Sequence, residues 1–102
     1  MPRRRALTGA QLAGLLALPA AEPDLIRHWT LDGADLAAVD RRRGDHNRLG
    51  FALQLCALRY PGRSLRAGEA IPGPALRFVA DQIGAMPEAL AAYSARTQTR
   101  YQ

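Results

Sequence analysis

The chain has 102 residues, of which 48% are hydrophobic and 23% are charged, and its formal net charge is +5. This length and composition fit one globular domain and exclude a disordered tail. Gly, Pro or a charge interrupts every apolar stretch before the ~20 residues that a membrane helix needs, so we expect a cytoplasmic protein with no membrane segment.

Six helices and no strand are predicted. Thr8 is a good N-cap for the first helix, in which leucines recur at roughly helical spacing until Pro19 stops it. A short linker follows. Pro23 then suits the first turn of a second helix that runs to Trp29, because proline is tolerated where the backbone N–H has no partner.

The third and fourth helices follow closely. Thr30 or Asp32 caps the third helix, which we expect to end in three consecutive arginines before Gly44 stops it. Asp45 is expected to cap the fourth helix, which runs to Tyr60 before a Pro-Gly pair breaks it. This helix is apolar on almost every side, which predicts that it forms the centre of the fold.

A fifth helix is expected to begin near Pro74 and end at Gly84, and Pro87 opens the sixth. The predicted fold is therefore all-α, a compact bundle of about six short helices around the central apolar helix at 45–60. The third and fourth helices could form a helix-turn-helix-like pair. His28, His46 and Cys56 lack metal-ligand spacing, so neither a metal nor another cofactor is expected.

Positive charge is concentrated in two segments. Residues 41–66 hold seven arginines against one acid, and residues 1–5 hold three arginines, while the rest of the chain is net negative. This distribution is typical of a surface that binds nucleic acid. All cations are arginine, which suits phosphate and guanine, although codon usage in a GC-rich genome explains the absence of lysine at least as well.

We therefore expect three parts: a flexible basic arm at 1–6, a helical DNA-binding domain at 7–95, and a polar tail or the start of a truncated helix at 96–102. The arm could enter a minor groove, with simple solvation as the alternative. The three arginines expected at the end of the third helix could neutralise phosphates. Alternatively, they could merely complement the helix dipole, an interaction worth ~0.3 to 1 kcal/mol. The candidate DNA-binding residues of these two segments are Arg3, Arg4, Arg5, Arg41, Arg42 and Arg43.

Candidates for reading bases lie in the first turn of the fourth helix, because the core needs the rest of that helix. His46, Asn47 and Arg48 could reach base edges there, with solvation, or support of the Asp45 cap by His46, as the alternative. Arg63 and Arg66 could contact the DNA backbone from the following loop. Arg100, with its two preceding neighbours, is a further candidate if the last helix extends.

Four blocks of sequence carry a resemblance to a known family. RRRGDHNRLGFALQLCALRYPGR, with LRFVADQIG after it and LLALP and DLIRHWTL before it, resembles the N-terminal DNA-binding region of the Tn-three family of replicative bacterial transposases. The match spans PRRRALT to ARTQTR in the expected order. In that family the region is a helical module that recognises terminal inverted repeats, and the catalytic acidic triad lies far downstream. The resemblance thus implies the first N-terminal lobe only, without catalytic residues.

Two functions remain open. The first is sequence-specific binding of double-stranded DNA at transposon ends, by a nucleoid-associated protein that could also associate with itself or with a full-length transposase. The second is a helical protein-interaction module whose arginines dock an acidic partner. Preference for an inverted-repeat duplex over a scrambled duplex separates them.

Overall fold

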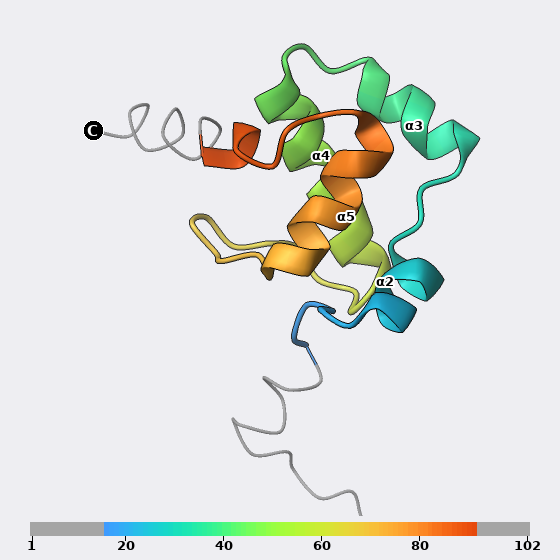
Figure 1. The fold of residues 1–102 in the computed structure, drawn as a ribbon, viewed down its shortest axis with the longest axis vertical. Helices are drawn as coiled ribbons and strands as arrows, with labels where there is room; N and C mark the ends of the chain where they lie inside the picture. Colours follow the sequence, from blue (N-terminus) through green and yellow to red (C-terminus); the bar gives the residue numbers. More distant parts are fainter. Residues whose placement is uncertain (1–15, 92–102) are drawn as a thin grey trace, which may run out of the picture.

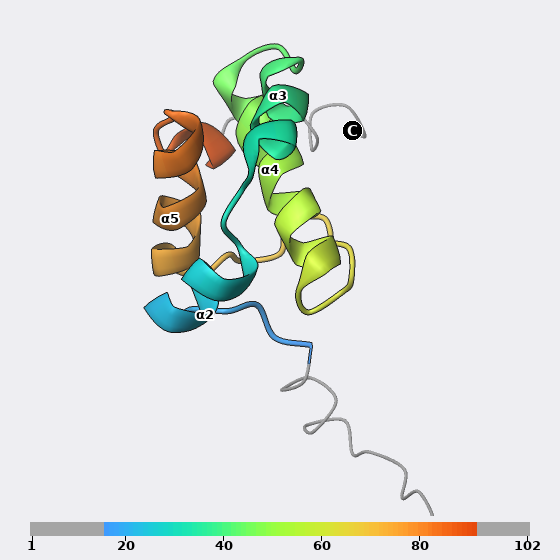
Figure 2. The same ribbon diagram turned by 90° about the vertical axis from the view of Figure 1, so that its right-hand side faces the viewer.

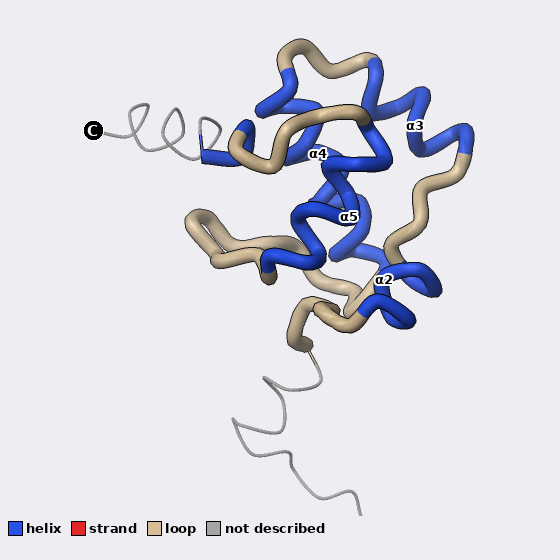
Figure 3. The backbone as a smooth tube through the Cα atoms, in the orientation of Figure 1, coloured by secondary structure: helices blue, strands red, loops and turns tan. Residues whose placement is uncertain are grey.

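The computed structural model describes residues 16–91, and Figure 1 shows its ribbon. The helices in this range are α2 (Glu22–His28), α3 (Gly33–Asp40), α4 (Asp45–Arg59) and α5 (Gly73–Ile83). Residues 89–91 are also helical, and no strand occurs between residues 16 and 91 (Figure 3). The all-α prediction is confirmed.

The expected first helix falls mostly outside the described residues, as do the arm at 1–6 and the tail at 96–102. Its expected last residues, 17–19, are described and are not helical. The residue before a proline is driven toward extended backbone, and here Leu18 precedes Pro19. Leu18 instead packs against the core from this loop.

Helix α4 is the centre of the described fold, as the sequence predicted. It packs against α3 and α5, and α2 contacts α5. Figures 1 and 2 show α4 and α5 side by side in two perpendicular views, with α2 at one end of the pair and the α3–α4 connection at the other. Leu49, Leu53 and Cys56 of α4 are buried together with Trp29 and Val79. The helix is not covered on every side, because Leu58 is 54% exposed.

Trp29 closes the core between α2 and α4. Its indole Nε1 donates to the backbone oxygen of Tyr60 at 2.8 Å, and its own backbone oxygen accepts from Gln82 Nε2 at 3.0 Å. Gln82 also accepts from the backbone N–H of Leu31 at 2.7 Å. A side chain of α5 thus satisfies the backbone of the α2–α3 connection, which has no helical partners there.

Asp32, not Thr30, caps α3. The Asp32 carboxylate accepts from the backbone N–H of Asp35 at 2.8 Å, and the Asp35 carboxylate accepts from the backbone N–H of Asp32 at 2.9 Å, which completes a capping box. Thr30 belongs to the preceding helix end, where its hydroxyl donates to the Ile26 carbonyl oxygen at 2.6 Å.

The expectation that Asp45 caps α4 was wrong. Gly44 occupies the N-cap position with φ 81°, and no side chain caps the helix. Asp45 is the first residue of α4, where a carboxylate is favoured by the positive end of the helix dipole. Its side chain forms an ion pair with Arg48 at 3.0 Å.

Asp35 is a buried carboxylate on α3. The residue is 6% exposed, and both of its carboxylate oxygens accept from the Arg59 guanidinium, one of them at 2.6 Å. Spacing within α3 could not reveal this, because the partner comes from α4. The hydrogen bonds from Arg59 lower the pKa of Asp35 to about 2.

Replacing Asp35 with asparagine should lower the free energy of unfolding by about 1.5 to 3 kcal/mol, since charge-assisted hydrogen bonds in a buried site are lost. The depressed pKa means that Asp35 stabilises the fold fully above pH ~4. That contribution is lost as the pH falls through about 2. Urea unfolding across this range checks both points; an Asp35→Asn variant with the parent's pH dependence would contradict them.

Candidate nucleic-acid interface

The connection between α3 and α4 carries the strongest local positive charge in the described structure. We call residues 41–44, Arg41, Arg42, Arg43 and Gly44, the arginine turn; all four are exposed. Helix α3 ends at Asp40, so the expectation that the arginines form its last turn was wrong. Because α4 packs back against α3, the chain must reverse direction, and Gly44 supplies the positive φ for that reversal.

The arginine turn is free to bind an external anion. Among the described residues, the side chains of Arg41, Arg42 and Arg43 make no hydrogen bond or ion pair. Arg48, Arg59 and Arg63, in α4 and the loop that follows it, differ in this respect. Arg48 and Arg59 are paired with internal carboxylates. Most of the unpaired positive charge of residues 41–66 therefore lies in the arginine turn.

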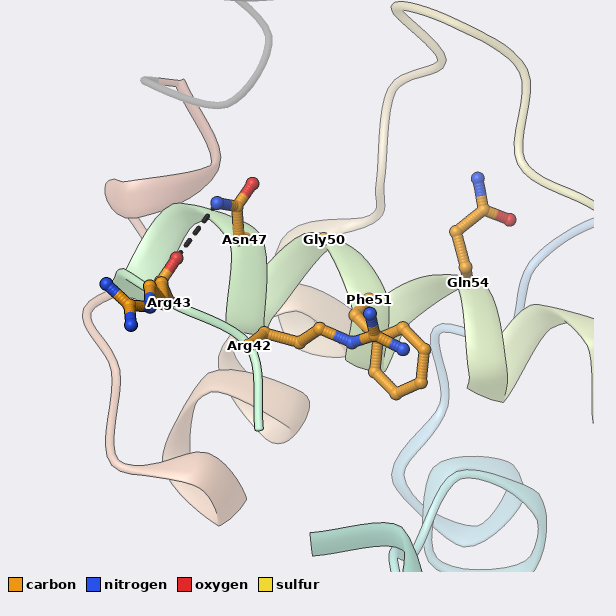
Figure 4. Close-up of a pocket in the computed structure, with 6 residues that line it drawn as sticks. All are labelled: Arg42, Arg43, Asn47, Gly50, Phe51 and Gln54. Carbon is orange, nitrogen blue, oxygen red and sulfur yellow. Dashed lines mark hydrogen bonds between the residues drawn. The ribbon is translucent and has the colours of Figure 1, made fainter. Parts of the chain in front are cut away.

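A pocket of about 340 Å³ adjoins the arginine turn along one face of α4. The Arg42 guanidinium lies over the Phe51 ring, with its central carbon 4.1 Å from the ring centroid (Figure 4). The pocket thus combines cations, amides and a half-buried aromatic ring. Its lining residues are Arg42, Arg43, Asn47, Gly50, Phe51 and Gln54.

Asn47 and His46 support the turn from the start of α4. The Asn47 amide Nδ2 donates to the backbone oxygen of Arg43 at 2.8 Å, as Figure 4 shows. The His46 ring lies against Gly44, where an added Cβ would meet its Cε1 at 2.9 Å. Both residues lie beside the exposed cations, and their roles in reading bases stay predictions.

Arg48 is part-buried and paired within the protein, although the sequence had suggested it as a base reader. Its guanidinium pairs with Asp40 and Asp45 at 3.0 Å each and donates to the Ile83 carbonyl oxygen at 2.7 Å. Asp40 and Asp45 flank the arginine turn, and Ile83 ends α5. We call this arrangement the Arg48 bridge, because one side chain fixes both ends of the turn to a third helix.

Replacing Arg48 with methionine should lower the free energy of unfolding by about 1 to 3 kcal/mol, because a part-buried carbonyl oxygen loses its charged donor. Urea denaturation followed by circular dichroism measures the change. Arg41→Met is the matched control, since this exposed neighbour has no partner among the described side chains and should unfold like the parent. Equal losses in both variants would contradict the Arg48 bridge.

Arg63 and Arg66 differ in whether their guanidinium groups are available to bind an external anion. Arg63 pairs with both oxygens of Glu69, at 2.9 and 2.6 Å, and donates from Nε to the Leu16 carbonyl oxygen. These hydrogen bonds lower the pKa of Glu69 to about 2. Arg66 is exposed, and its backbone N–H donates to the same carboxylate at 3.0 Å. Arg63 therefore closes the loop after α4, while Arg66 keeps its guanidinium at the surface.

The remaining predicted site residues, Arg3, Arg4, Arg5 and Arg100, lie outside the described residues. Across residues 16–91, no three His, Cys, Asp or Glu side chains gather where they could hold a metal ion. Burial raises the pKa of the Cys56 thiol to about 12, which leaves it protonated. No helix in the same range has the length and apolarity to cross a membrane.

Phe51 and Gln54 line the pocket but were not predicted from the sequence. Both residues lie on a helix that was expected to be apolar on almost every side, and neither was a candidate site residue. Their spacing contains a usable signal: Asn47, Phe51 and Gln54 recur at helical intervals of four and three residues, and therefore share one face of α4. That face begins directly beside the arginine turn.

The fold and the exposed turn define a small helical module with a surface suited to a polyanion. Residues 6–102 match the family described as Domain of unknown function (DUF4158), and the chain belongs to that family. It is also similar to transposases, which confirms the resemblance to the N-terminal region of the Tn-three family. No solved structure matches.

The similarity to these relatives covers nearly the whole chain. The chain is 46% identical to the transposase for transposon Tn501 of Pseudomonas aeruginosa and 49% identical to the transposase for transposon Tn21 of Escherichia coli, each over 98% of its length. The transposase for Tn1546 of Enterococcus faecium is 38% identical over 94% of the chain. The chain spans only about 10% of the length of each.

Proposed function

We propose that this chain binds double-stranded DNA at the terminal inverted repeats of a transposon, as a recognition part of a transposase, and that it supplies no catalytic residue. The observation that carries the proposal is the arginine turn, three exposed arginines that pair with no acidic side chain of residues 16–91. Their charge is available for phosphates, and each neutralised phosphate releases counterions from the duplex. Such a protein would work at DNA in the bacterial cytoplasm.

The relatives support the proposal at a coarser level. They are transposases, enzymes whose reaction is carried out on DNA, and the chain matches them over nearly its full length. Since the chain covers a tenth of those proteins, DNA binding and catalysis can lie in different segments of a full-length transposase. Because Arg48, Arg59 and Arg63 are paired with carboxylates, the arginine turn is the main contact that we propose on the described part of the chain.

A gel-shift titration tests this function. The probes are a duplex carrying the terminal inverted repeat of transposon Tn21 and a scrambled duplex of the same length and composition, each at several salt concentrations. We expect tighter binding to the repeat and a steep loss of affinity with salt. Equal affinity for both duplexes would overturn sequence-specific recognition.

A separate observation favours an alternative function, docking of an acidic protein partner. Three large apolar side chains, Ile26, Leu58 and Met86, are more than half exposed, at 55%, 54% and 66%. Such residues can contact another protein, and the arginines would then meet an acidic surface of that partner. Absence of any salt-dependent DNA binding in the same titration would favour this alternative.

A further inference from the structure

The three arginines of the turn are not equivalent. Arg42 stacks on Phe51, with 4.1 Å between the guanidinium carbon and the ring centroid, whereas neither Arg41 nor Arg43 contacts an aromatic ring of residues 16–91. Figure 4 shows the Arg42 side chain extended along α4 to reach the ring, while Arg43 lies at the end of the pocket near Asn47. One cation is thus held in a defined orientation.

Stacking leaves the recognition edge of Arg42 available. The guanidinium carbon lies over the ring, so the N–H groups that point away from the ring keep their hydrogen-bonding capacity. No acidic side chain lines the pocket in the described structure, and none pairs with Arg42. A cation that is oriented but unpaired is prepared to bind two adjacent acceptors at fixed positions.

Guanine offers such a pair of acceptors. Its O6 and N7 atoms point into the major groove, and arginine binding both is the commonest specific contact between proteins and DNA. A phosphate also accepts from arginine, but a flexible cation meets that need and gains little from an aromatic support. Gly50, which has no side chain, also lines this pocket.

We propose that Arg42 reads a guanine in the major groove, that Phe51 positions its guanidinium, and that Arg41 and Arg43 bind phosphates. The inference rests on the proposed binding of transposon ends. It makes Phe51 a determinant of sequence preference even though it forms no hydrogen bond itself. Loss of one good arginine–guanine pair should reduce discrimination by roughly 5- to 100-fold.

The first experiment compares variants on the inverted-repeat and scrambled duplexes across salt. Phe51→Leu and Arg42→Lys should each lower the ratio of the two affinities by that factor without changing the slope against salt, because charge is kept. Arg43→Ala should do the opposite: the slope falls by about one and the ratio is kept. Phe78→Leu, a matched change of a half-buried phenylalanine on α5, should alter neither.

The second experiment removes the acceptor from the DNA. Duplexes carrying 7-deazaguanine, which lacks the N7 acceptor, at one guanine at a time should identify a single position where the parent protein loses affinity. At that position Arg42→Lys should cost less affinity than it costs on the unmodified duplex, since one of the two acceptors is already gone. Additive losses at every guanine would overturn the assignment of Arg42.

The two proposals fail differently. If the parent protein does not prefer the inverted repeat, the proposed function itself is wrong. If the parent prefers the repeat but Phe51→Leu and Arg42→Lys keep that preference, only the reading role of Arg42 is wrong. A fall in the salt slope for Phe51→Leu would likewise overturn it, because Arg42 would then be a phosphate contact. Circular dichroism of each variant verifies that the helices are retained.

Discussion

Replacing Arg41, Arg42 and Arg43 together with alanine should weaken binding to inverted-repeat DNA by about 100-fold at ~0.1 M salt, and the slope against salt should fall by two to three. The reason is that these exposed side chains pair with no carboxylate among the described residues, so their full charge is available to the duplex. Helical content should be unchanged, because the turn lies outside the core. Gel shifts and circular dichroism measure the two quantities.

The control removes arginines elsewhere. Arg27 on α2 and Arg77 on α5 are also exposed, and α2 lies at the opposite end of the helix pair from the arginine turn (Figures 1 and 2). A protein with both changed to alanine should bind DNA nearly as well as the parent. Equal losses in the two variants would mean that net charge alone drives binding, and would refute the arginine turn as the site.

Replacing Trp29 with alanine should reduce the free energy of unfolding by about 3 to 5 kcal/mol. The side chain is fully buried between α2 and α4, and its indole N–H bonds the Tyr60 carbonyl oxygen at 2.8 Å. A domain of this size has only about 5 to 15 kcal/mol of stability in total. We therefore expect a large fraction of the variant to be unfolded, as seen in urea titrations followed by circular dichroism.

Trp29→Phe keeps most of the apolar volume but loses the indole N–H, and its cost should be less than half of that for alanine. The comparison separates packing from the hydrogen bond. If Trp29→Ala unfolds at the same urea concentration as the parent, the tryptophan does not close the core as described. The DNA affinity of folded Trp29→Phe should equal that of the parent, since Trp29 directly follows α2, and α2 lies at the opposite end of the α4–α5 pair from the arginine turn (Figure 1).

Much of the fold could be predicted because its signals are local. Pro23, Pro74 and Gly84 mark helix starts and stops through fixed backbone preferences, and the structure has them in those roles. The central position of α4 followed from its apolar composition. The start of α4 could not be predicted as well, since Gly44 and Asp45 both suit a helix N-terminus and only the reversal after α3 decides between them.

The candidate site was predictable only in part, because charge in the sequence does not reveal pairing in space. Arg42 and Arg48 look alike in the run RRRGDHNR, yet one is exposed over Phe51 and the other is bound by two carboxylates and a carbonyl oxygen. Asp35 and Arg59 are 24 positions apart, and their contact depends on how α3 packs against α4. Long-range pairs of this kind lie beyond any local pattern.

The Arg48 bridge has a consequence for dynamics. The last carbonyl groups of a helix lack intrahelical donors, and at the end of α5 Ile83 receives its donor from α4 at 2.7 Å. Fraying of α5 must therefore release the guanidinium that also anchors Asp40 and Asp45. In hydrogen exchange, the amides that open with the last turn of α5 and those at the start of α4 should form one cooperative unit, so the cations of the turn are kept in place from a distant part of the sequence.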